Sequence, residues 1–167
     1  MTTTNTMETN YRNALKEIKA YGVKTKVNVM ECCRSCVTNE KLGIANDDVA
    51  IIWQYGGQGH AVSWVNGLPV DRAELNEYKQ SRSWYNLNRY MNNPAEHMVW
   101  GVWFNHNALT EEQRDKVYAI FTAHGFVVNW DKADRDAKCI EIDFKQTYLN
   151  AQAVTAEEAI KTDYAMC

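Results

Sequence analysis

The stretch "HMVWGVWFN", residues 97–105, decides the fold class. It is dense in apolar residues on both of its alternating faces, which is typical of a strand at the centre of a sheet, covered from two sides. A chain of 167 residues can bury about two-thirds of its unfolded surface. One core built around this strand therefore needs neither a disulfide nor a metal ion to be stable.

Helical patterns lie on both sides of the predicted central strand. Upstream, one apolar face is formed by four residues at three- and four-residue spacing: Tyr11, Ala14, Leu15 and Ile18. Gly22 follows them and suits the left-handed residue that ends a helix. Downstream, Thr110 and Gln113 in "LTEEQ" have the spacing of a capping box, which predicts the start of a second helix.

Further strands are predicted upstream of residues 97–105. The segment "VKTKVNVME", residues 23–31, alternates apolar and polar residues as a half-buried strand does. Residues 47–55 and 60–65 flank the glycine-rich "GGQG", which favours a hairpin with a loop of about four residues. "NGLPVD", residues 66–71, then interrupts the pattern.

A second pair of strands is predicted downstream. "FVVNW" at 126–130 and "KCIEIDF" at 138–144 are joined by a charged turn, and Glu141 and Asp143 share one face of the second strand. Together these elements predict an α+β fold: a single domain with a mostly antiparallel sheet and helices packed on it. The polar residues 1–10 are expected to form a flexible N-terminus, and residues 11–167 the single α+β domain.

The charge pattern narrows the class of partner. The net charge is −3 and no run of lysine or arginine stands out, which argues against a dedicated nucleic-acid binder. No apolar stretch reaches the ~18 residues of a membrane span. The N-terminus has neither a basic start nor an apolar centre, so we expect no signal peptide and a soluble, cytoplasmic protein. Five cysteines in a reducing compartment are not expected to form a disulfide framework.

Three of those cysteines are clustered in "MECCRSC", residues 30–36. Zinc prefers four tetrahedral ligands, commonly two pairs whose members are about two residues apart. Cys33 and Cys36 have this gap, and Cys32 lies beside them. The chain has no second such pair, so a zinc site would need Cys139 or a histidine from elsewhere: His60, His97, His106 or His124.

Two other interpretations of the cluster stay open. A thiol-redox site needs one cysteine with a lowered pKa at the first turn after a strand, and "VNVMECCRSC" permits that arrangement, with Arg34 favouring a thiolate nearby. The third interpretation is that Cys32, Cys33 and Cys36 are small, partly buried residues without chemistry. The cofactor prediction is accordingly zinc or none.

The aromatic residues suggest a contact surface. The segment "SRSWYNLNRYMNN", residues 81–93, is polar, rich in asparagine and aromatic, and tryptophan and tyrosine are favoured at interfaces. The predicted partner-binding residues are Arg82, Trp84, Tyr85, Arg89 and Tyr90. An alternative is a small-molecule pocket lined by Trp53, His60 and Trp64.

The leading hypothesis is therefore a non-enzymatic interaction module that binds a protein partner or its own copy. A small regulatory or inhibitory protein, including one of viral origin, fits this profile. The alternative is a zinc-binding or thiol-redox protein that uses Cys32, Cys33 and Cys36.

Two regions resemble a family of small bacterial α+β domains of unknown function. One is the strand that ends in Cys32-Cys33-x-x-Cys36, and the other is "HGFVVNWDKADRDAKCIEIDF", a strand ending in Trp-Asp, a charged turn and a closing strand. The resemblance covers residues 12–144. The family has glycine where this chain has Val37, and a His-Gln-Gln-Asp-like segment where this chain has "YGGQGHAV". The resemblance implies the fold and assigns no activity.

Overall fold

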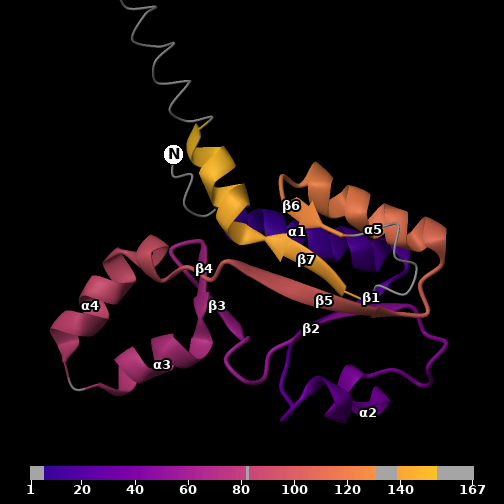
Figure 1. Cartoon of the computed structure of the whole chain (residues 1–167), viewed down its shortest axis with the longest axis horizontal. Helices are drawn as coiled ribbons and strands as arrows, with labels where there is room; N and C mark the ends of the chain where they lie inside the picture. Colours follow the sequence, from indigo (N-terminus) through magenta and orange to yellow (C-terminus); the bar gives the residue numbers. More distant parts are fainter. Residues whose placement is uncertain (1–5, 82, 131–138, 154–167) are drawn as a thin grey trace, which may run out of the picture.

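A five-stranded mixed sheet forms the centre of the molecule, in the order β1-β2-β5-β7-β6 (Figure 1). The structure is a computed structural model that describes residues 6–81, 83–130 and 139–153. Its strands are β1 (Lys24–Val29), β2 (Ile51–Tyr55), β5 (Gly101–Asn107), β6 (Val127–Asn129) and β7 (Cys139–Asp143). β1 and β2 are parallel, and the other neighbours are antiparallel. The predicted α+β single domain with a mostly antiparallel sheet is confirmed.

Two helices cover one face of this sheet, and the main core lies between them and the strands. They are α1 (Thr6–Tyr21) and α5 (Glu111–Ala123). Ala14 and Ile18 of α1, together with Val117 and Phe121 of α5, are buried against the sheet. The predicted capping box at the start of α5 is present, with Thr110 and Gln113 bonded to each other's backbone N–H.

The central strand is covered on one face only, which corrects the prediction of a strand covered from two sides. Val102, Phe104 and His106 of β5 are buried, whereas Trp103 between them is 39% exposed. β7 alternates in the same way, with Ile140 and Ile142 buried in the main core. Trp103 lies opposite Glu141 of β7 in the ladder. We call the side of the sheet that carries Trp103 and Glu141 the second face.

The second face is covered at β1 and β2 by the segment that joins these two strands. That segment includes a single 3₁₀ turn, η2 (Arg34–Cys36), and a short helix, α2 (Asn39–Leu42). Its Leu42 and Ile44 pack on Ile51, Trp53 and Tyr55 to form a second, smaller core. All residues of β2 are buried, because this segment covers Ile51, Trp53 and Tyr55 while Ile52 lies in the main core on the other face. The part of the second face at β5 and β7 remains accessible.

The predicted hairpin across "GGQG" is wrong. β2 pairs with β1 and β5, and the strand that follows the glycines, β3 (Val62–Val65), pairs instead with β4 (Leu68–Asp71). The turn between them is Asn66-Gly67, whose φ angles of 50° and 80° are those of a tight hairpin turn. "NGLPVD", expected to interrupt the strand pattern, thus supplies both a turn and a strand.

Three further helices complete a third core around this hairpin. They are α3 (Arg72–Gln80), α4 (Trp84–Asn92) and the 3₁₀ helix η3 (Pro94–His97). Val65 and Val70 of the hairpin pack with Leu75 of α3 and Tyr90 of α4. Asp71 caps α3 by accepting from the Ala73 N–H, and Glu74 in the first turn of this helix contacts His97.

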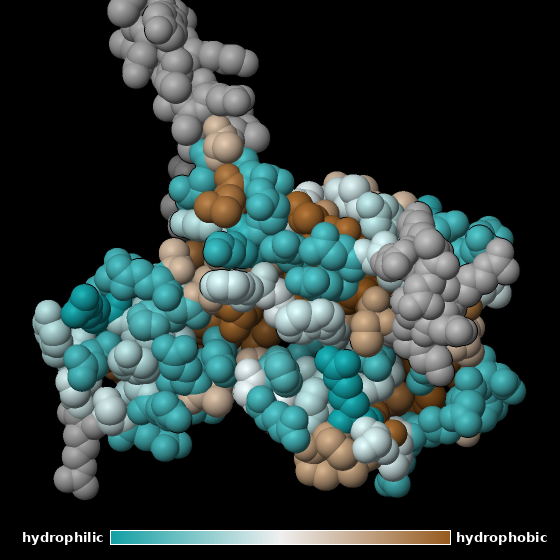
Figure 2. Space-filling model, in the orientation of Figure 1, coloured by the Kyte–Doolittle hydropathy of each residue, from teal (hydrophilic) through white to brown (hydrophobic). Residues whose placement is uncertain are grey.

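The N-terminal helix begins earlier than the sequence pattern predicts. Residues 6–10, expected to be flexible, belong to α1, and Met7 is buried in the main core. A further helix covers residues 144–153. Among the described helices, none has the length and hydrophobicity needed to span a bilayer. Hydrophilic side chains cover most of the face seen in Figure 2, with smaller hydrophobic areas between them.

Candidate metal centre

The cysteine segment, residues 30–36, is held in place by the end of β2 and the loop that follows it. The Gly56 N–H donates to the carbonyl of Val29, the last residue of β1, at 2.9 Å. The Tyr55 hydroxyl donates to the Glu31 carbonyl at 2.6 Å, and the Gln58 amide to the Cys32 carbonyl at the same distance. Three carbonyls before the η2 turn are thus fixed by hydrogen bonds from the last residue of β2 and the loop after it.

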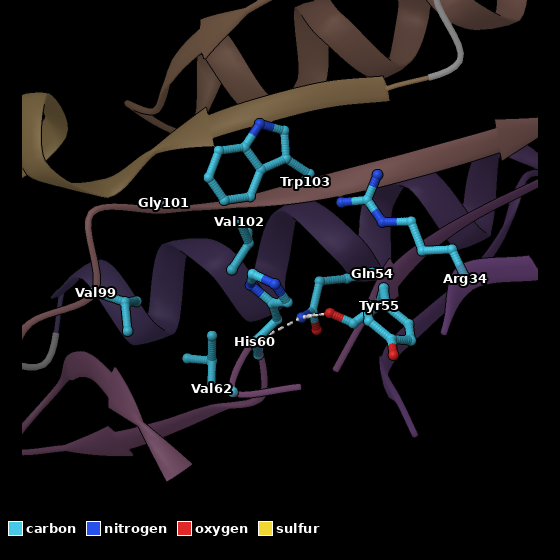
Figure 3. A pocket seen from close by; sticks show the side chains of 10 residues that line it. Arg34, Gln54, Tyr55, His60, Val62, Val99, Gly101, Val102 and Trp103 are labelled. Carbon is cyan, nitrogen blue, oxygen red and sulfur yellow. Dashed lines mark hydrogen bonds between the residues drawn. The ribbon is translucent and has the colours of Figure 1, made fainter. Parts of the chain in front are cut away.

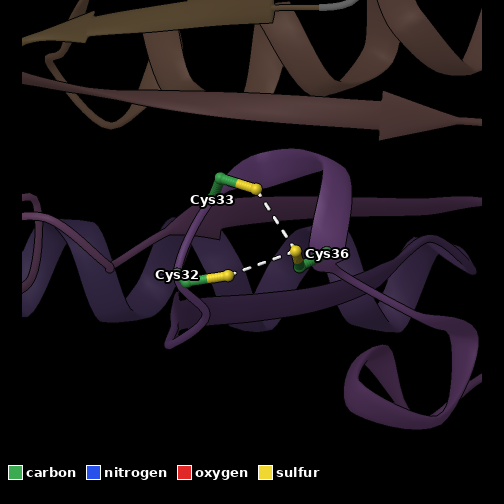
Figure 4. A group of neighbouring side chains, drawn as sticks. All are labelled: Cys32, Cys33 and Cys36. Atoms are coloured by element: carbon green, nitrogen blue, oxygen red, sulfur yellow. Dashed lines mark hydrogen bonds between the residues drawn. The ribbon is translucent and has the colours of Figure 1, made fainter.

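The η2 turn brings the side chains of Cys32, Cys33 and Cys36 together, and we call these three residues the thiol cluster (Figure 4). The Sγ atom of Cys36 lies 3.2 Å from the Sγ of Cys32 and 3.2 Å from that of Cys33. All three sulfurs lie within 4.8 Å of one another. Cys32 and Cys36 are exposed, so an ion could reach the cluster from solvent. The group could hold a metal ion.

The thiols of the cluster differ in acidity. The Ser35 hydroxyl, 3.0 Å from the Cys33 sulfur, and the Cys36 thiol lower the pKa of Cys33 to about 7 by hydrogen bonding to its thiolate. The hydrogen bonds of Cys36 with Cys32 and Cys33, followed by their negative charge, raise its pKa to about 12. Near neutral pH one thiolate therefore lies beside thiols that donate to it.

Cys139, the fourth predicted zinc ligand, does not join the thiol cluster. It lies on the second face, where the Arg34 guanidinium donates to its Sγ at 3.7 Å. The Cys139 thiol donates in turn to the Asn105 side-chain carbonyl at 3.7 Å. Arg34 therefore connects Cys139 to the η2 turn, and the described residues bring three of the four predicted cysteine ligands together.

The histidines lie apart from the cluster. His97 contacts Glu74 at 2.9 Å and His124 contacts Glu17 at 2.8 Å. His106 is buried on the main-core face of β5, next to Trp130. His60 is exposed on the loop after β2. Among the described residues, the thiol cluster has no histidine member.

His60 lines a cavity, but not with the two tryptophans predicted to accompany it. Trp53 is buried in the second core, and Trp64 packs against the main core beside Tyr11. The cavity beside His60 is lined instead by Trp103 and Arg34, among others (Figure 3). Sequence reasoning missed these residues because they come from three separate segments. The one signal was Arg34, a cation between the cysteines.

The predicted contact surface is only partly exposed. Trp84 and Tyr85, in the first turn of α4, are 76% and 69% exposed, and Arg89 is exposed as well. Tyr90 is fully buried, with its ring 4.1 Å from that of His97, so it is not available to a partner. This corrects its assignment. Arg82 lies outside the described residues.

Comparisons of the chain with protein-family models, curated proteins and solved structures found no match. The resemblance to a bacterial family remains a prediction.

Proposed function

We propose that this protein binds a zinc ion through Cys32, Cys33 and Cys36. The observation that supports the proposal is the convergence of three sulfurs within 4.8 Å at an exposed turn. A redox pair needs two thiols and leaves the third without a role, whereas a metal ion uses all three. Thiolates are the ligands that soft and borderline metals such as zinc select.

The sulfur separations fit tetrahedral zinc with a small adjustment. A Zn–S bond of about 2.3 Å with tetrahedral angles places sulfur atoms about 3.8 Å apart. Two pairs in the cluster are 3.2 Å apart, and the limit for all pairs is 4.8 Å. The required value lies between these distances. Rotation of three exposed or half-exposed side chains is enough to reach it.

The surroundings favour the charge that zinc binding would create. Three thiolates and one Zn²⁺ carry one net negative charge. Arg34 lies within the cluster's own turn and supplies a nearby positive charge. With three protein ligands, the fourth position is open to water or to another ligand, as in zinc sites that carry out chemistry or exchange.

Cysteine variants test the proposal through zinc affinity. Cys32→Ser, Cys33→Ser and Cys36→Ser should each weaken binding by at least about tenfold in competition with a chromophoric chelator, since loss of a ligand costs more than loss of a partner outside the ligand shell. Cys139→Ser is the matched control and should leave the affinity within about twofold. Equal affinities for all four variants would contradict the site. A metal-free protein that forms a reversible Cys33–Cys36 disulfide would favour the redox alternative.

A second candidate function is self-association through the first turn of α4. Trp84 and Tyr85 expose 76% and 69% of their surface, and such residues favour interfaces. Sedimentation velocity over a range of concentrations tests this candidate. Trp84→Ala with Tyr85→Ala should abolish dimer formation, while Trp100→Ala, at a 71% exposed position outside α4, should not. A wild-type protein that stays monomeric would contradict it.

A further inference from the structure

A cavity of about 90 Å³ lies beside the thiol cluster, and Cys32, Cys33 and Cys36 are not among the residues that line it (Figure 3). Its wall combines Arg34 from η2 and His60 from the loop after β2 with Trp103 from the second face of β5. The remaining lining residues include Tyr55, Val62, Val99 and Val102. We call this cavity the Arg34 pocket.

The positive charge at the Arg34 pocket comes from the Arg34 guanidinium, whose side chain is exposed. Among the described residues that line the pocket, none is an aspartate or a glutamate. Among the described residues, the only hydrogen-bond partner of the Arg34 guanidinium is the Cys139 thiol, at 3.7 Å. A thiol is a weak, neutral acceptor, so among the described residues that line the pocket the guanidinium has no carboxylate partner. Glu141, beside Trp103 in the ladder, makes no ion pair with Arg34 in the described part of the chain.

The pocket is built on a fixed support. The amide nitrogen of Gln54, which is 2% exposed, donates to the carbonyls of Tyr55 and His60 at 2.6 and 2.9 Å. Its side-chain oxygen accepts from the backbone N–H of Asn28 at 2.6 Å. Gln54 is therefore committed to holding the loop. Among the described residues that line the pocket, Arg34, His60 and Trp103 carry the remaining side-chain nitrogen atoms.

The other wall is aromatic and aliphatic. The His60 ring lies edge-on to the Trp103 indole, with centroids 6.5 Å apart, and 6.1 Å from the Tyr55 ring. Val62 and Val102 complete this apolar side. A ligand that fits both walls has a negatively charged end and a small apolar body.

The volume of the Arg34 pocket limits the size of the ligand that it can hold. One water molecule needs about 10–15 Å³ of cavity volume. The Arg34 pocket, at about 90 Å³, therefore holds a ligand the size of about six to nine water molecules. A guanidinium presents a planar pair of N–H donors that matches a carboxylate. We infer that the Arg34 pocket binds a small monocarboxylate, with its carboxylate on Arg34 and its apolar body against Trp103. This inference does not depend on zinc.

Isobutyrate and its neutral isostere isobutyramide test the inference by NMR titration of the ¹⁵N-labelled protein. Isobutyrate should shift the indole N–H signal of Trp103, assigned with Trp103→Phe, and the shift should saturate. Isobutyramide, which has the same shape, should bind at least about tenfold more weakly, because a hydrogen bond to a charged group contributes about 1.5–3 kcal/mol. Equal binding of the two compounds, or a shift that never saturates, would overturn the inference.

Variants locate the binding to the guanidinium. Arg34→Met should weaken isobutyrate binding by at least about tenfold, and Arg34→Lys, which keeps the charge and loses the planar fork, should give an intermediate value. Arg89→Met, an equivalent change at an exposed site on α4, is the matched control. Phosphate is titrated in parallel. Unchanged binding in Arg34→Met, or tighter binding of phosphate than of isobutyrate, would contradict the assignment.

Discussion

Cys33 and Cys36 have the same side chain and lie one 3₁₀ turn apart, yet their thiols differ in acidity. The two pKa values differ because the Cys33 sulfur accepts hydrogen bonds when it is a thiolate, which stabilises its ionised form. Ser35 and Cys36 donate to the Cys33 thiolate. The hydrogen bonds of Cys36 with Cys32 and Cys33 raise its own pKa, and the negative charge of these two sulfurs adds to the effect. At the residue scale, the direction of a few hydrogen bonds sets the chemistry of the thiol cluster.

The first prediction concerns alkylation of the reduced, metal-free protein. The Cys33 pKa of about 7 lies below its usual 9, so the thiolate and the iodoacetamide rate should grow as pH rises through about 7. Cys36, with a pKa of about 12, should react far more slowly over the same range. Peptide mapping by mass spectrometry measures both rates. Ser35→Ala should move the Cys33 midpoint upward, and a wild-type midpoint near 9 would contradict this account.

A second residue-scale prediction concerns Gly57, which is buried behind the cysteine segment. A Cβ atom built there would overlap the Glu31 carbonyl oxygen and the Tyr55 hydroxyl. These two atoms form the hydrogen bond that fixes the segment before Cys32. Gly57→Ala should lower the free energy of unfolding by about 1–3 kcal/mol through overpacking. Urea denaturation measures the loss of unfolding free energy. A stability equal to that of the wild type would show that the segment before Cys32 moves aside without cost and would contradict the prediction.

At the element scale, local signals predict helix ends well. The capping box of Thr110 and Gln113 forms as the sequence indicates, because both partners lie within four residues. The adjacent strands β6 and β7 pair as predicted for a similar reason. β2 could not be placed in this way, since its partners β1 and β5 are brought to it by the whole fold.

The turn at Asn66-Gly67 shows how a local signal can be missed. Two strands separated by Asn-Gly are a strong hairpin pattern, because both residues accept positive φ. The "GGQG" segment has more glycines, but the strands on either side of it do not pair with each other. Gly56 and Gly57 are glycines for close approach to neighbouring parts of the chain. An added Cβ at Gly56 would meet the backbone of Asn28 in β1, and one at Gly57 would meet the carbonyl of Glu31 before the cysteines.

The capping box gives the third prediction. Thr110→Ala removes the side-chain oxygen that accepts from the Gln113 N–H at 3.1 Å, and it should lower the free energy of unfolding by about 1 kcal/mol. Thr122→Ala, at an exposed position within the same helix, is the matched control and should change stability less. Urea unfolding compares the two variants. An equal effect of both substitutions would contradict the capping contribution.

At the scale of the whole molecule, the three hydrophobic cores and the thiol cluster are separate. None of the buried residues that form the cores is a member of the cluster. The thiol cluster comes from one turn of the chain, whereas the Arg34 pocket joins segments from η2, the loop after β2, and β5. Cysteines that lie close together in the sequence can be recognised from the sequence alone. A pocket whose residues lie far apart in the sequence can be recognised only from the folded sheet that brings them together.

The fourth prediction follows from that separation. Removal of zinc with a strong chelator should leave the far-ultraviolet circular dichroism spectrum unchanged. The melting temperature should fall only as far as the loss of the zinc-binding free energy requires. A zinc finger, by contrast, unfolds without its metal because it has no sufficient core. Cys139→Ser with and without chelator is the control. Unfolding on chelation would show that the metal supports the fold.

The measurement that tests the central claim most directly is native mass spectrometry of the purified protein before and after chelation. The account predicts one zinc ion per chain, removed by the chelator, retained in Cys139→Ser and lost in Cys36→Ser. A wild-type protein that takes up no zinc when the ion is supplied, or a Cys36→Ser variant that holds it equally well, would contradict the thiol cluster as a metal centre.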